Sequence, residues 1–147
     1  MFTQLRLNRV FGFAVSTRGA TAVEFAVLMP VYLLLLLGMT AYGIYFGASH
    51  SVQQISADTA RAALAGITAE ERKALALDFV DRHASGYLFI DRAKLTIEAA
   101  DSQQGNGQFN VTVRYDASEL PIWNLVDRLA MPSQTILRRS TIRIGGI

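Results

Sequence analysis

An apolar run from Phe25 to Ala48 constrains this chain more than any other feature of its sequence. Its 24 consecutive residues include no Asp, Glu, Lys, Arg or His. About 20 such residues, rising 1.5 Å each in a helix, cross a bilayer core of about 30 Å. The leucines from Leu33 to Leu37 leave this helix without a polar face. The sequence therefore predicts one membrane-spanning helix, placed at residues 20–48.

Charges on the two sides of the run predict its orientation. Arg6, Arg9 and Arg18 precede it with no acid among them, and the first basic residue after it is Arg61. Basic flanks stay in the cytoplasm, so we expect a cytoplasmic N-terminus and a C-terminal part outside. A cleaved secretory signal would instead have an apolar region of about 7–15 residues.

One acid stands at the start of the apolar run. Glu24 follows Gly19 by five residues. An ionisable group at the edge of a hydrocarbon span is costly, and it is read first as a functional site. A glycine provides an unhindered backbone that a protease can draw into an extended conformation. The pattern predicts a processed membrane segment whose acid has a function.

These residues resemble the cleavage region of type IV prepilins. In that class a leader peptidase cuts after a glycine, and the fifth mature residue is Glu, often followed by Phe. Here the cut would follow Gly19, Ala20 would become the first residue, and Glu24 and Phe25 the fifth and sixth. More narrowly, residues 18–47 resemble the TadE-like family of tight-adherence (Flp) pilus systems.

The resemblance implies a structural role in a pilus apparatus. The protein would be a pseudopilin or minor pilin in the bacterial inner membrane, with a periplasmic C-terminus, or in the pilus after assembly. Its partners would be the prepilin peptidase and other pilin-like subunits of TadE, TadF or TadG type, or the major pilin. No cofactor, metal, nucleic acid or small-molecule substrate is expected.

Composition gives no support for catalysis or nucleic-acid binding. The chain has 14 basic and 12 acidic residues, but residues 20–147 alone have 11 and 12, so the basic excess is a topology signal. It has no cysteine. His50 and His83 lack ligand-spaced partners, and no catalytic motif is present. We therefore expect no enzyme. Two alternatives stay open: an uncleaved single-pass protein whose periplasmic head binds a partner, and a membrane-anchored hydrolase.

The remaining pattern predicts an α+β, pilin-like fold. Gly43 and Gly47 form a small-xxx-small pair suited to helix packing in lipid. Beyond the span a helical stripe continues the helix as a stalk over residues 49–66. The stripe consists of Val52, Ile55, Thr59 and Ala62. With a leader at 1–19 and the span at 20–48, this leaves residues 67–147 for a small head.

Within the head, a capping box from Thr68 to Glu71 predicts a helix over residues 69–84. Alternating patterns predict a small antiparallel sheet with strands at 95–99, 109–115 and 133–144, and a hairpin loop at 101–108. A short helix is expected at 121–130. The last strand carries a basic cluster, expected to lie on a solvated strand edge, of Arg138, Arg139 and Arg143.

Overall fold

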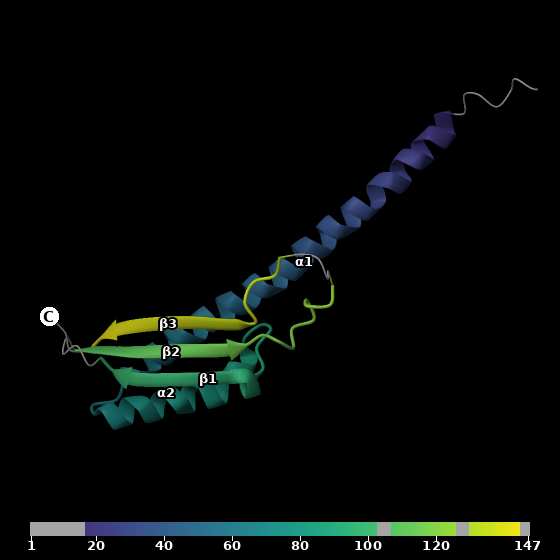
Figure 1. Cartoon of the computed structure of the whole chain (residues 1–147). Helices are drawn as coiled ribbons and strands as arrows, with labels where there is room; N and C mark the ends of the chain where they lie inside the picture. The colour runs from purple at the N-terminus through teal and green to yellow at the C-terminus, as the bar shows by residue number, and fades with distance from the viewer. Residues whose placement is uncertain (1–16, 103–106, 126–129, 145–147) are drawn as a thin grey trace, which may run out of the picture. The chain divides into compact units, whose positions relative to one another are not determined.

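The computed structural model describes residues 17–102, 107–125 and 130–144 (Figure 1). The chain forms two compact units, residues 1–36 and 37–147. The predicted α+β fold is confirmed. The elements in chain order are α1 (Thr17–Ala63), α2 (Ala69–His83), the 3₁₀ turns η1 (Ala84–Gly86) and η2 (Arg92–Lys94), β1 (Leu95–Asp101), β2 (Gln108–Asp116) and β3 (Thr135–Arg143).

The first unit consists of the N-terminal part of α1. Its large apolar side chains are exposed all round the helix, from Val23 at 65% to Leu36 at 59%. A helix with apolar residues on every side is stable in lipid or in the core of an assembly, where water is absent. Pro30 lies inside α1 without ending it. Neighbouring helices or side chains can satisfy the carbonyl that proline leaves without a partner.

In the second unit, α1 supplies a floor of small residues for the head. The predicted stripe is confirmed at Val52, Ile55 and Thr59, which are fully buried. Alanines and serines on both sides widen it into a face, because short side chains let another element approach the helix closely. The flanking buried residues are Ala48, Ser49, Ser51, Ser56, Ala60 and Ala63.

Helix α2 begins and ends where its sequence signals predict. The Thr68 side chain accepts a hydrogen bond from the Glu71 backbone, and the Glu71 carboxylate accepts one from the Thr68 backbone. This capping box satisfies two donors that the helix leaves free. The buried side of α2 is formed by Arg72, Ala76 and Val80.

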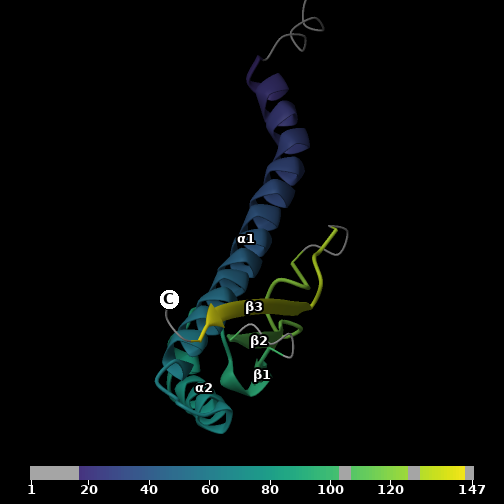
Figure 2. The same ribbon diagram turned by 90° about the vertical axis from the view of Figure 1, so that its left-hand side faces the viewer.

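The three strands form one antiparallel sheet in the order β1-β2-β3 (Figure 2). In the central strand, Phe109, Val111 and Val113 are fully buried, while Arg114 on the opposite face is exposed. The buried face contacts α1: Ser140 Oγ on β3 lies 2.6 Å from Ser56 Oγ. The opposite face of the sheet is polar.

One prediction about the head needs correction. Residues 121–125 form turns rather than the start of a helix; residues 126–129 lie outside the described part. The Trp123 indole N–H donates to the Ala117 carbonyl at 2.6 Å, which holds this segment in a turn. The basic cluster lies, as predicted, on an edge strand, β3, and its three arginines are exposed. Arg138 turns to the helix side and donates to Ser49 Oγ at 2.5 Å, and Arg139 lies on the opposite face.

The buried side chain of Arg72 stabilises the connection between α1 and α2. Arg72 donates through Nε and Nη2 to the two carboxylate oxygens of Asp101, at 3.1 and 2.6 Å. Its Nη1 donates to the carbonyls of Gly66 and Ile67. Gly66 is buried, and a Cβ there would lie 2.6 Å from the Arg72 backbone nitrogen. The turn therefore requires a residue without a side chain.

Candidate functional site: the N-terminal membrane helix

The predicted cleavage site lies in the first turns of α1. The helix begins at Thr17, so the Gly19–Ala20 bond has helical backbone, and Gly19 is exposed. The first backbone N–H groups of a helix have no partner within it. Glycine destabilises a helix by about 1 kcal/mol relative to alanine. Local opening at Gly19 is therefore less costly than opening further along the helix.

Glu24 and Phe25 lie on the exposed surface of the same helix. Phe25 is 60% exposed, and Glu24 shares an open hollow on the helix surface with apolar side chains. These neighbours are Val23, Val27 and Leu28. A carboxylate in such surroundings is stabilised in an assembly only by a positive partner. Among the described residues, none forms an ion pair with Glu24.

One helix among the described residues is long and apolar enough to cross a membrane, and it covers Thr21–Ala63. This finding rests on length and composition. It agrees with a single-pass membrane protein. Of the arginines that predict its orientation, Arg6 and Arg9 lie outside the described residues, as does the Arg18 side chain. The orientation therefore stays a prediction.

The two glycines of the small-xxx-small pair have different surroundings. Nothing lies within 4 Å of a Cβ built on Gly43, so this surface is open. A Cβ on Gly47 would lie 3.0 and 3.1 Å from the ring of Phe89, which comes from the head. Gly43 is available for another helix, whereas Gly47 already packs on its own chain.

Contacts between the head and residues 42–47 were not predicted from the sequence. The Tyr42 hydroxyl donates to the Ala130 carbonyl, and the Tyr45 hydroxyl donates to the Ser133 carbonyl at 3.2 Å. Aromatic side chains such as Tyr42, Tyr45 and Phe46 at the end of a span favour the membrane interface. Nothing in the sequence pattern of residues 130–133 indicated which loop would meet these side chains.

The described residues hold no group of three or more His, Cys, Asp or Glu side chains that could bind a metal ion. His50 is exposed. His83 stacks on Phe79 with ring centroids 4.6 Å apart, and its Nδ1 lies 2.9 Å from the Phe79 carbonyl. His50 is thus a surface residue, and His83 packs against its own helix.

A comparison with known protein families finds a similarity on α1. The family model described as TadE-like protein matches residues 19–61. The match begins at Gly19 and ends near the end of α1, so it covers less than a third of the chain and none of the sheet. No curated protein and no solved structure gives a significant match.

The chain therefore carries a TadE-like domain at residues 19–61, and the predicted resemblance is confirmed. Over these residues the chain is similar to TadE-like proteins, and the matched segment lies on an apolar helix of membrane length.

Proposed function

We propose that this protein is a structural, pilin-like subunit of the tight-adherence pilus apparatus, processed after Gly19 and assembled through its N-terminal helix. The TadE-like match carries the proposal, because it begins at the glycine that would precede the cut. Glu24 and Phe25 then occupy the fifth and sixth positions after that glycine.

Processing is the first step. Arg6, Arg9 and Arg18 hold the leader on the cytoplasmic side of the membrane. A membrane leader peptidase then cuts the bond between Gly19 and Ala20. Unwinding of the helix from Thr17 to Gly19 delivers an extended backbone to this peptidase.

Cleavage creates a positive α-amino group at Ala20, one helical turn from Glu24. Residues four apart on a helix are neighbours, so the two groups can pair within one chain. When helices pack, the same carboxylate can pair with the amine of an adjacent subunit. Pairing offsets the desolvation of both charges and fixes the axial stagger of neighbouring helices.

Assembly then covers the apolar surface of the first unit. Side chains such as Val27, at 68% exposure, are in contact with lipid in the membrane and with other helices after assembly. The open surface at Gly43 allows close approach of a second backbone. Gly43→Leu tests this contact without disturbing Phe89, whereas Gly47→Leu would also displace the Phe89 ring. We expect Gly43→Leu to insert normally and to crosslink less to a pilin-like partner.

The processing step is tested with Gly19→Val. Valine places a stiff β-branched side chain at the cut, so the full-length form should accumulate while membrane insertion is unchanged. The measurement is the intact mass of the purified protein, from cells with and without the leader peptidase. Gly12→Val is the control and should be trimmed like the wild type. Efficient trimming of Gly19→Val would show that the cut lies elsewhere.

The pairing step is tested with Glu24→Gln. We expect normal insertion, the mature mass, and poor incorporation into the pilus assembly, because glutamine keeps the size and loses the charge. Glu98→Gln, which removes an exposed acid from the head, should assemble normally. Full piliation by a completely processed Glu24→Gln protein would contradict the charge-pairing mechanism.

This proposal assigns the chain no catalytic activity and no cofactor. Its main alternative is an uncleaved single-pass protein whose head binds a periplasmic partner. The helical backbone across the Gly19–Ala20 bond is the observation in its favour. An N-terminal methionine retained in the presence of the leader peptidase would support this alternative.

A further inference from the structure

We propose that the head rests on the bilayer surface through the loop Tyr87–Ile90, which places Leu88 and Phe89 in the lipid headgroup layer. This inference rests on the membrane anchoring of the proposed function and does not require pilus assembly.

The position of this loop along α1 supports the proposal. A bilayer core is crossed by about 20 helical residues. Counted from Phe25, the first residue after the last charge before the run, the core ends at Ile44. Phe89 packs against Gly47, three residues further along the helix. Three residues correspond to about 4.5 Å, so Phe89 reaches the level of the headgroups.

The loop is held in this place by contacts at both ends. The Tyr87 hydroxyl donates to Asp58 at 2.8 Å, which ties the start of the loop to α1. The buried Tyr115 donates to the Phe89 carbonyl at 3.0 Å, which ties the loop to β2. The Leu88–Phe89 tip is therefore presented by a fixed backbone.

The tip exposes apolar side chains at a strained backbone position. Phe89 has φ of 61°, in the left-handed region that residues other than glycine rarely adopt. Strain of this kind is retained where the surrounding structure requires it, often at functional positions. Leu88 is 64% exposed, and Phe46 on the adjoining turn of α1 is 57% exposed. Apolar and aromatic side chains at one level are typical of the membrane interface.

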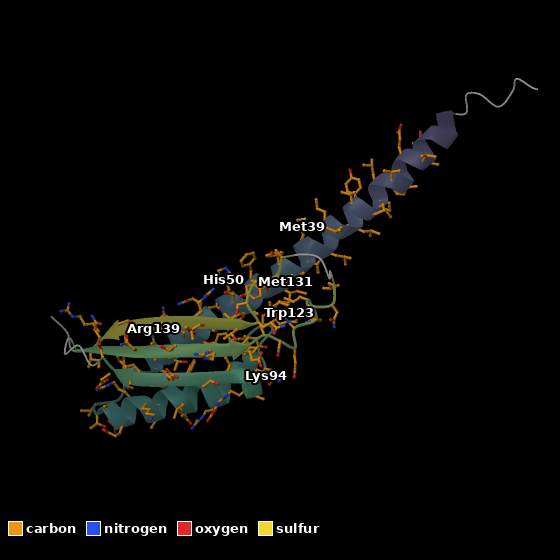
Figure 3. All side chains as sticks on the ribbon, in the orientation of Figure 1. Met39, His50, Lys94, Trp123, Met131 and Arg139 are labelled. Carbon is orange, nitrogen blue, oxygen red and sulfur yellow. The ribbon has the colours of Figure 1, made fainter. Side chains whose placement is uncertain are left out.

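A second loop meets the helix at Tyr42 and Tyr45, just before Gly47. Residues 130–133 accept hydrogen bonds from Tyr42 and Tyr45. Neither this loop nor Tyr87–Ile90 contains a charged residue. Figure 3 shows Met131 and Trp123 at the end of the sheet where Lys94 precedes β1. Charges near this end, such as Lys94 paired with Glu119, are compatible with headgroups because their polar ends stay in water.

A single-cysteine fluorescence experiment tests the inference, because the chain has no native cysteine. Leu88→Cys is labelled with the environment-sensitive dye NBD, and the full-length protein is reconstituted in phosphatidylethanolamine/phosphatidylglycerol vesicles. Ile67→Cys is the control, since its side chain is exposed and lies in the connection between α1 and α2. We expect the Leu88 probe alone to shift to shorter wavelength and to lose intensity when lipids carry a doxyl quencher near the headgroup.

Three results would overturn the inference. Emission from the Leu88 probe that matches the Ile67 probe and resists quenching would place the loop in water. A shift that requires a second pilin-like subunit would make this surface a protein interface. Release of the protein from vesicles by alkaline carbonate would contradict membrane anchoring itself. Retention in carbonate with an unquenched Leu88 probe would contradict this inference alone.

Discussion

At the scale of single residues, the hydroxyl of Thr59 is unusual. Thr59 is fully buried on α1, and its Oγ1 has no hydrogen-bond partner among the described residues. A buried polar atom without a partner costs about 1–3 kcal/mol. The sequence predicted this position as part of the buried stripe. It could not predict the missing partner, because partners depend on which strand residues face the helix.

Thr59→Val removes this hydroxyl and keeps the shape of the side chain. We expect it to raise the free energy of unfolding by about 1 kcal/mol. Denaturant unfolding in micelles, followed by the fluorescence of Trp123, the only tryptophan, measures the change. Ser56→Ala is the matched control. It breaks the contact with Ser140, so the free energy should fall by about 1 kcal/mol. A Thr59→Val protein less stable than the wild type would contradict this account.

Tyr87 makes the stability of the folded head depend on pH in alkaline solution. Burial, with the hydrogen bond to Asp58, raises the pKa of the Tyr87 phenol to about 12 from 10.0. The raised pKa means that this stabilisation is complete below pH 10 and is lost as the pH rises from about 10 to 12. Burial also raises the pKa of Tyr115, and the bond to Glu119 raises the pKa of Lys94, so both contribute to the same loss.

The comparison of wild type with Tyr87→Phe isolates this contribution. The variant lacks the phenol, so it should be less stable than the wild type at pH 8, and the difference should shrink as the pH approaches 12. Unfolding midpoints in a pH series measure it. A difference that is constant across the series would show that the Tyr87 hydroxyl does not carry the effect.

At the scale of elements, the sequence predicted each helix and strand from local signals. The capping box determined the start of α2, and period-two alternation determined the strands. The predicted helix at 121–130 was wrong in its described part. Pro121 and the apolar residues after it fit the start of a helix as well as they fit a turn. The hydrogen bond from Trp123 to Ala117 favours a turn instead. The Arg72–Asp101 pair joins distant elements, so local signals contained no trace of it.

Gly66→Ala tests the turn between α1 and α2. An added Cβ would lie 2.6 Å from the Arg72 backbone nitrogen, so the two elements must separate. We expect a loss of about 1–3 kcal/mol, as is typical of overpacking. Gly86→Ala is the control, because nothing lies within 4 Å of its added Cβ. Equal midpoints for the two variants in denaturant unfolding would disprove the close approach.

Arg72→Ala should lower the unfolding midpoint more than Arg82→Ala. Arg72 bonds Asp101 and two carbonyls from a buried position, whereas Arg82 pairs with Asp78 on an exposed helix face. Exposed pairs contribute little. The comparison uses the same unfolding assay. A larger effect for Arg82→Ala would assign the turn's stability to other contacts.

At the scale of the whole molecule, the residues of the candidate site could be named from the sequence, whereas the contacts around them could not, and the processing role of these residues stays a prediction. The cleavage motif and the span are local in sequence, so Gly19, Glu24 and Phe25 could be named from it. The partnership of Gly47 with Phe89 could not, because the two residues belong to distant segments. Gly43 and Gly47 look equivalent in the sequence, and only folding distinguishes them.

Topology is the prediction at this scale. The basic flank predicts that the head lies outside the inner membrane. Glu70→Cys, at an exposed position of α2, should react with a membrane-impermeant maleimide in intact spheroplasts. In cells that lack the leader peptidase, Asn8→Cys should react only after permeabilisation. Labelling of Asn8→Cys in intact spheroplasts would reverse the orientation.

The small-residue floor of α1 has a consequence for how such proteins diverge. Ala48, Ala60 and Ala63 are fully buried, so a larger side chain at any of them would overpack the core and substitutions there are closely limited in volume. The polar face of the sheet has no such limit. Residues on the outward face of the sheet can therefore be substituted while the helix beneath the sheet is retained. The match to the TadE-like family model likewise covers the helix and none of the sheet.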